Sequence, residues 1–238
     1  MTLAALLHIP TVYLLTGLVG AVLLLWLGRD HREASPALSL FAAGIFALGV
    51  GFMAFAAREP LTGWLAPMVG YAGFGISAVL IWLGSRQLYG YPRTEGLTLM
   101  AGLVLAGYVV ALFALREPSA NAAIARISLS SAFVVVFMGL AAFESHRSHW
   151  IASLRSVRLL RALLILFSAL LTVRAIIFLA HGIALHPDGS APPGVLRMFF
   201  AAVFGSMPFA ITVSVLSIAN SQLSERLHRM ATTDDLTG

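Results

Sequence analysis

Two residue types with reactive side chains are absent from this sequence of 238 residues. There is no cysteine, which excludes disulfides, thiolate metal sites and cysteine nucleophiles and leaves the redox compartment open. There is no lysine either, because all 15 basic residues are arginine. Since retinal binds through a lysine Schiff base, a retinal photoreceptor is excluded.

Charged residues in general are few. They make up 11% of the sequence, against 59% hydrophobic residues, and this balance is typical of an integral membrane protein. The net charge is +5, but the arginines occur between and at the ends of apolar runs, where they set membrane topology, so we predict no nucleic-acid site. The first apolar run lacks a basic leading segment and a small-residue cleavage site, which predicts a retained spanning helix.

Seven apolar runs are each about as long as the roughly 20 residues that cross a bilayer. They predict an all-α polytopic membrane protein with spans at residues 9–28, 37–57, 63–84, 96–115, 121–143, 159–181 and 196–219. Residues 43–60 resemble residues 101–118, which suggests helical hairpins repeated in a 2+2+2+1 plan. Such repeats are parallel, unlike the inverted repeats of many transporters.

The arginines are distributed unevenly about these spans. If the N-terminus lies outside, the inner side holds ten of them, namely Arg29, Arg32, Arg86, Arg93, Arg147, Arg155, Arg158, Arg161, Arg226 and Arg229. The outer side holds three, Arg58, Arg116 and Arg197. This asymmetry predicts that the N-terminus is outside and the C-terminus is cytoplasmic.

The C-terminal stretch carries a heptad pattern that continues from the seventh span. Leu216, Asn220, Leu223, Leu227 and Met230 follow one another at steps of 4, 3, 4 and 3. This is the seam of a parallel coiled coil, with the polar Asn220 at an a position, where it fixes register. The pattern predicts a homodimer joined through this helix.

The last eight residues read ATTDDLTG and resemble the beginning of a GGDEF (diguanylate cyclase) domain, whose first motif reads approximately A-x-T-D-x-L-T-G. Asp234, Leu236, Thr237 and Gly238 occupy the motif positions. The resemblance implies a bacterial inner-membrane protein with a transmembrane sensor domain at 1–219, a coiled-coil signalling helix at 220–231 and the start of a GGDEF domain at 232–238.

GGDEF domains condense two GTP molecules into cyclic di-GMP when two of them face each other in a dimer. The resemblance therefore implies that GTP and Mg²⁺ bind in a domain beyond Gly238. We expect no catalytic residue and no cofactor in this chain, which would not itself be an enzyme. Its expected function is to control the cyclase as a transmembrane input module.

Two arginines lie inside predicted spans, and intramembrane charge is costly enough to suggest function. We predict an outward-facing pocket lined by Arg174, Arg126 and Arg197, with the aromatic residues Tyr71 and Phe178. Guanidinium groups suit carboxylate or phosphate, so the expected ligand is an anionic amphiphile or a small acid. Alternatively, the long side chains extend to the headgroups or bind backbone carbonyls.

Two further segments have two interpretations each. Pro208, in the middle of the seventh span, predicts a kink that is either a static packing feature or a signalling hinge. Residues 144–158 form the longest predicted cytoplasmic loop, which is expected to contact anionic membrane lipids or to dock onto the downstream domain.

Other functions remain open from the sequence. His8, His181 and His186 are expected near the outer side, where they could bind metal or haem in a redox sensor. The GGDEF domain could be degenerate and fused to a phosphodiesterase. A transporter is disfavoured by the parallel repeats and by the lack of carboxylates inside the predicted spans.

Overall fold

The computed structural model describes residues 3–30, 35–56, 64–91, 94–117, 119–147, 155–180 and 195–234. These residues form seven α-helices and, within the described ranges, no strand. The helices are α1 (Leu3–Asp30), α2 (Ser35–Ala56), α3 (Leu65–Leu88), α4 (Glu95–Ala114), α5 (Ala120–Arg147), α6 (Arg155–Ala180) and α7 (Val195–Asp234). All seven are long and apolar enough to cross a membrane, so the predicted helical class and helix number are confirmed.

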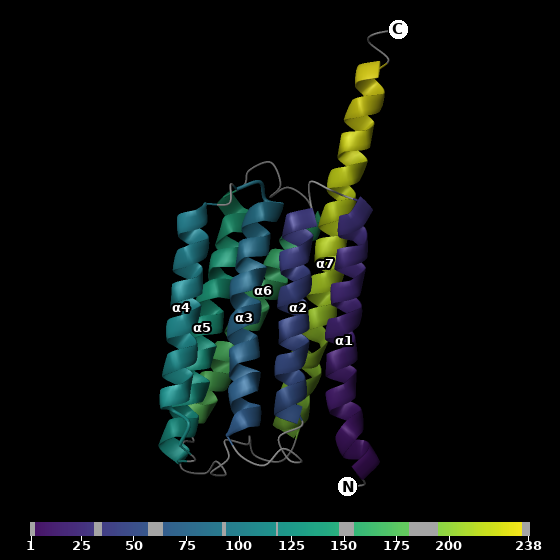
Figure 1. Cartoon of the computed structure of the whole chain (residues 1–238). Helices are drawn as coiled ribbons and strands as arrows, with labels where there is room; N and C mark the ends of the chain where they lie inside the picture. Colours follow the sequence, from purple (N-terminus) through teal and green to yellow (C-terminus); the bar gives the residue numbers. More distant parts are fainter. Residues whose placement is uncertain are drawn as a thin grey trace.

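Six of the helices form a closed ring of packed neighbours, and Figure 1 shows them side by side. In the described residues α2 packs on α1 and α3, α3 packs on α5, α5 on α6, and α6 on α7, which returns to α1 and α2. Helix α4 lies outside this ring against α3, with a small contact to α5. The predicted hairpin repeat pairs α2 with α4, but these two helices occupy different environments.

Glycines set the close approach of the ring helices. A Cβ atom on Gly17 of α1 would lie 2.9 Å from the Cα of Gly49 on α2. A Cβ on Gly73 of α3 would lie 2.8 Å from the carbonyl oxygen of Ala47, also on α2. Because both positions lack a side chain, α2 packs backbone to backbone with its two neighbours, as small residues allow in membrane bundles.

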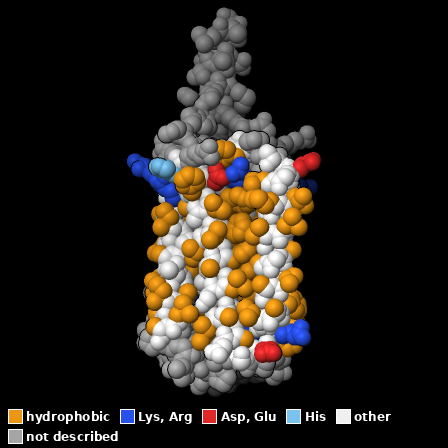
Figure 2. All heavy atoms as spheres, turned by 90° about the vertical axis from the view of Figure 1, so that its left-hand side faces the viewer, with side chains coloured by type: hydrophobic (Ala, Val, Ile, Leu, Met, Phe, Trp, Pro, Cys, Tyr) orange, Lys and Arg blue, Asp and Glu red, His pale blue; other side chains and the backbone are white. Residues whose placement is uncertain are grey.

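Hydrophobic side chains cover the bundle's sides as well as filling its interior. The interior holds fully buried residues from several helices, among them Leu24, Phe41, Ile81, Met138, Leu164 and Ile211. Large apolar side chains are also exposed, among them Val110, Leu99, Phe143 and Ile165. On the face drawn in Figure 2, hydrophobic side chains form a broad belt, with charged side chains above and below it. This arrangement suits a bundle surrounded by lipid.

Helix α7 extends beyond the other helices. It is 40 residues long, continues through Pro208, and crosses the predicted boundary after residue 219 without a break. Its C-terminal part projects from the bundle, whereas the chain's N-terminus lies at the opposite end (Figure 1). We call these two ends the α7 end and the N-terminal end.

The predicted loop at 144–158 is wrong at both of its ends. Helix α5 continues to Arg147 and α6 already begins at Arg155, and residues 148–154 lie outside the described part of the chain. Most residues at 144–147 and 155–158 are polar, but none is Gly or Pro, and charge alone does not end a helix. Glu144 thus lies within the apolar span Asn121–His146, which corrects the expectation that spans lack carboxylates.

Candidate functional site

An ion pair joins α3 to α5 at the α7 end. The Arg86 guanidinium, in the last turn of α3, donates to the carboxylate of Glu144 on α5. The Glu144 side chain is 9% exposed and that of Arg86 is 23% exposed. The guanidinium also lies over two aromatic rings, 5.9 Å from the Trp82 centroid and 5.4 Å from the Tyr91 centroid. Aromatic faces favour a cation, so Arg86 is held from several sides.

The surroundings of this pair contain buried polar atoms. The second carboxylate oxygen of Glu144 and the indole nitrogen of Trp82 have no hydrogen-bond partner within the described residues. Burial raises the pKa of the neighbouring Tyr89 hydroxyl, and the positive charge of Arg161 offsets part of this rise. Removing one member of such a pair leaves an uncompensated buried charge, which is strongly destabilising.

The same turn of α3 is connected to α7. The side-chain amide of Gln222 donates to the carbonyl oxygen of Leu88 over 3.2 Å. Leu88 is two residues after Arg86, so the end of α3 is bound to α5 by the ion pair and to α7 by this amide. A displacement of α3 relative to α5 can therefore reach α7 where it leaves the bundle.

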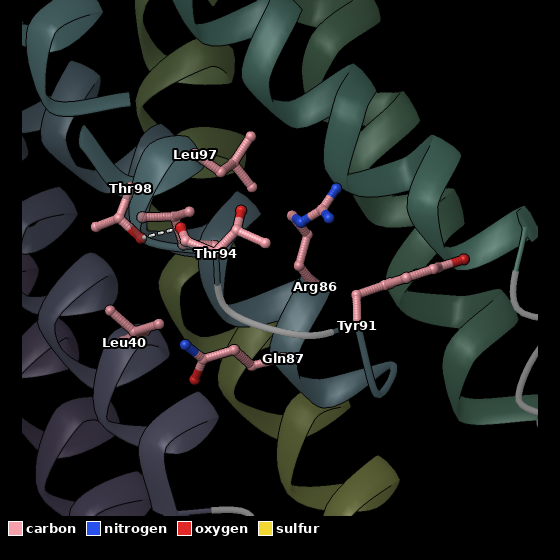
Figure 3. A pocket seen from close by; sticks show the side chains of 8 residues that line it. Leu40, Arg86, Gln87, Tyr91, Thr94, Leu97 and Thr98 are labelled. Atoms are coloured by element: carbon pink, nitrogen blue, oxygen red, sulfur yellow. Dashed lines mark hydrogen bonds between the residues drawn. The ribbon is translucent and has the colours of Figure 1, made fainter. Parts of the chain in front are cut away.

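A small recess opens beside Arg86, between α2, α3 and α4 (Figure 3). Its lining residues are Leu40, Leu83, Arg86, Gln87, Tyr91, Thr94, Leu97 and Thr98. The Thr98 hydroxyl is not directed at a ligand, because it donates to the Thr94 carbonyl over 3.3 Å. The volume of about 10 Å³ holds one water molecule at most. In this conformation the recess cannot take a larger ligand.

Of the predicted ligand-binding residues, Arg126 is buried near the N-terminal end. Its guanidinium donates to the carbonyl oxygens of Leu115 and Glu117, the latter over 3.0 Å. Both carbonyls follow α4, where the last turn of a helix leaves acceptors without intrahelical donors. The arginine thus binds backbone carbonyls, as in the alternative considered for it, and its role in ligand binding stays a prediction.

Arg174 occupies a different neighbourhood. It is half-buried on α6, with its guanidinium carbon 6.0 Å from the ring centroid of Phe204 on α7. Phe204 is four residues before Pro208 and packs edge-to-face on Phe167 of α6, with centroids 5.5 Å apart. Arg174 therefore contacts the turn of α7 that precedes the proline.

Tyr71 belongs to a buried cluster formed by α3, α4 and α5. Its carbonyl oxygen accepts a hydrogen bond of 2.9 Å from the Tyr108 hydroxyl, and its ring packs against Phe55. In the part of the chain that the structure describes, α6 contacts neither α3 nor α4. The structure therefore does not bring Arg174 together with Tyr71. The side chains of Arg197 and Phe178, also predicted for this pocket, lie outside the described residues.

The residues predicted for signalling all lie on α7. Pro208 is buried, and its carbonyl oxygen accepts a hydrogen bond of 2.7 Å from the Thr212 hydroxyl. In the seam, Asn220 is exposed and Leu223 is half-buried. The backbones of Leu227, Met230 and Asp234 are helical, but their side chains lie outside the described residues, as do Leu236, Thr237 and Gly238 entirely.

The predicted histidine site also falls outside the described part of the structure. The side chain of His8 and all of His181 and His186 belong to the residues that are not described. Among the residues that are, no group of three histidine, aspartate or glutamate side chains could hold a metal ion. The metal or haem alternative stays a hypothesis.

Sequence reasoning missed the ion pair and the Gln222 contact. The sequence predicts Arg86 on the inner side and Glu144 in the loop at 144–158, and it predicts no contact between them. The signal that could have paired Arg86 with Glu144 is that both residues lie at the same depth relative to the membrane. Each occupies one of the last turns of a long apolar helix, and both helices end on the same side.

No known protein family, curated protein or solved structure matches this chain.

Proposed function

We propose that this chain is the transmembrane input module of a dimeric bacterial signalling protein, and that α7 transmits its signal to a cytoplasmic diguanylate cyclase domain. The observation that carries the proposal is the continuity of α7, which runs from inside the bundle to Asp234. A continuous helix transmits rotation and displacement, whereas a flexible linker would absorb them. The predicted heptad seam begins inside the bundle, where Leu216 packs against the core, and continues to Met230 near the C-terminal end of α7, where a second copy could pair with it.

Two contacts of α7 suggest where a signal enters it. Near the N-terminal end, Arg174 lies against Phe204, so an anionic or amphiphilic ligand that attracts the guanidinium would change the packing before Pro208. At the α7 end, Gln222 binds the carbonyl of Leu88. In the proposed orientation the first contact lies in the outer half of the bacterial inner membrane and the second near the cytoplasm.

The residues that the gene encodes after Gly238 provide the first test. A GGDEF domain that continues the ATTDDLTG motif in frame supports the proposal. A stop codon there, or an unrelated domain, refutes the assignment to a cyclase.

The dimer seam can be tested by cross-linking because the chain has no cysteine of its own. Single cysteines at Asn220, Leu223 or Leu227 should form disulfides between protomers in oxidised membranes. Cysteines at Ser221 or Glu225, which lie off the seam on the same helix, are the matched controls. Equal cross-linking at all five positions would show that the α7 helices of two protomers meet at random and do not pair in a fixed register.

Asn220 offers a second test of the dimer. Replacement by leucine should strengthen the association and loosen its register, because a buried polar a-position residue specifies register at a cost in stability. In the protein with its downstream domain, Asn220→Leu is expected to raise cyclic di-GMP without a stimulus. If this variant dimerises normally and is regulated normally, the seam only joins the two protomers and its register does not control the signal.

A further inference from the structure

Helices α5 and α6 carry a basic cluster where they meet at the α7 end. The Nη1 atom of Arg161 lies 3.2 Å from Nδ1 of His146, across the two helices. A guanidinium has only donors, so Nδ1 must be the acceptor, which leaves the proton of the neutral ring on Nε2. Nε2 is then a hydrogen-bond donor on a side chain that is exposed.

Two more arginines add to this charge. Arg158 is exposed and lies one turn before Arg161, on the same side of α6, and Arg155 at the start of the helix is also exposed. The one acidic residue of α5 and α6 is Glu144, which is buried and paired with Arg86. The cluster's positive charge therefore faces outward without a carboxylate from either helix. Figure 2 shows arginine and histidine side chains together at this end, directly above the hydrophobic belt.

A strip of exposed residues without charge continues from the cluster along the membrane part of the same two helices. On α5, Phe143 and Gly139 lie three and seven residues before His146 and so share its side of the helix. Phe143 is 59% exposed, and a Cβ atom on Gly139 would have nothing within 4 Å. On α6, Ile165 lies four residues after Arg161 and is 55% exposed. We call these residues, with Leu166, the lipid-facing strip.

From this arrangement we propose that the chain binds one anionic phospholipid at the α5–α6 boundary. The phosphate binds Arg158, Arg161 and the Nε2 proton of His146, and an acyl chain lies along the lipid-facing strip over Gly139. At 1.5 Å per residue, Gly139 lies about 10 Å below His146, within reach of an acyl chain whose headgroup binds the cluster. This proposal goes beyond the input function and does not depend on it.

The test measures lipid bound to the purified full-length chain by native mass spectrometry, with added phosphatidylglycerol or phosphatidylcholine. We expect one retained phosphatidylglycerol and no comparable binding of phosphatidylcholine. Loss of two guanidinium charges in Arg158→Gln/Arg161→Gln should weaken phosphatidylglycerol binding about 30-fold. The matched control is Arg29→Gln. Arg29 is an exposed arginine of α1 at the α7 end of the bundle, and its replacement should leave the affinity for phosphatidylglycerol unchanged.

A second variant tests the apolar half of the site. Gly139→Leu occupies the open space over Gly139 without changing charge and should weaken phosphatidylglycerol binding even if the double arginine variant fails to fold. Displacement of the lipid by millimolar inorganic phosphate would instead assign the cluster to a free anion. Four results would each overturn the proposal. They are this displacement by phosphate, equal binding of the two lipids, equal weakening of binding by Arg29→Gln, and unchanged binding in Gly139→Leu.

Discussion

The Arg86–Glu144 pair gives the sharpest prediction about stability. Glu144→Gln keeps the shape of the side chain but removes its charge, so the arginine loses its counterion. Breaking a fully buried pair typically costs about 3–5 kcal/mol. Arg86 is 23% exposed and keeps its contacts with the Trp82 and Tyr91 rings, so we expect a smaller loss, about 2–3 kcal/mol of unfolding free energy.

The pairwise part of this loss can be isolated by a double-mutant cycle. Arg86→Gln and Glu144→Gln are each expected to destabilise, and the double variant should be less destabilised than the sum of the two, with a coupling energy of about 1–2 kcal/mol. Unfolding of the purified protein in mixed micelles, titrated with sodium dodecyl sulfate, measures these free energies.

The control is Glu95→Gln, which removes an exposed carboxylate at the same end of the bundle, in the first turn of α4. It should cost about 0.5 kcal/mol, the usual value for a charge at a helix start. If Glu144→Gln costs no more than this control, or if the two single effects simply add, Arg86 and Glu144 do not stabilise the fold as a pair.

Three other changes test separate contacts. Gly73→Ala should cost about 1–3 kcal/mol of unfolding free energy, because its Cβ would lie 2.8 Å from a carbonyl oxygen of α2, whereas Gly96→Ala, with open space around it, should stabilise α4. Arg126→Gln should speed hydrogen exchange at the end of α4, where Arg126 binds two carbonyls, and the exposed Arg116→Gln should not. Gln222→Ala removes a hydrogen bond worth about 1 kcal/mol, and faster exchange should appear where α7 leaves the bundle; unchanged exchange would contradict a link to α3.

The helices were predictable from the sequence because each span is a long apolar run, which in lipid must satisfy its backbone groups within a helix. Their neighbours were not predictable. Lipid is as apolar as a protein interior, so a helix such as α4 can be hydrophobic on every side and gives no periodic signal of which side faces its partners. The position of α4 outside the ring is therefore a result of the structure alone.

The same limit applies to the candidate sites. The sequence indicated that Arg126 and Arg174 are unusual, because charge inside an apolar run is costly. It could not indicate their partners, since the carbonyl of Leu115 and the ring of Phe204 are ordinary features of any membrane helix. Glu144 was placed in a loop because of its charge, although the helix around it contains no residue that would end it.

The length of α7 beyond Pro208 makes the helix a lever. From Pro208 to Asp234 there are 26 residues, which at 1.5 Å each give an arm of about 39 Å. A change of only about 5° in direction at the proline would move the far tip by about 3 Å, roughly the rise of two residues along a helix. Rearrangements too small to open a cavity in the bundle would thus displace the tip of α7 far enough to change its contacts with a second, facing chain.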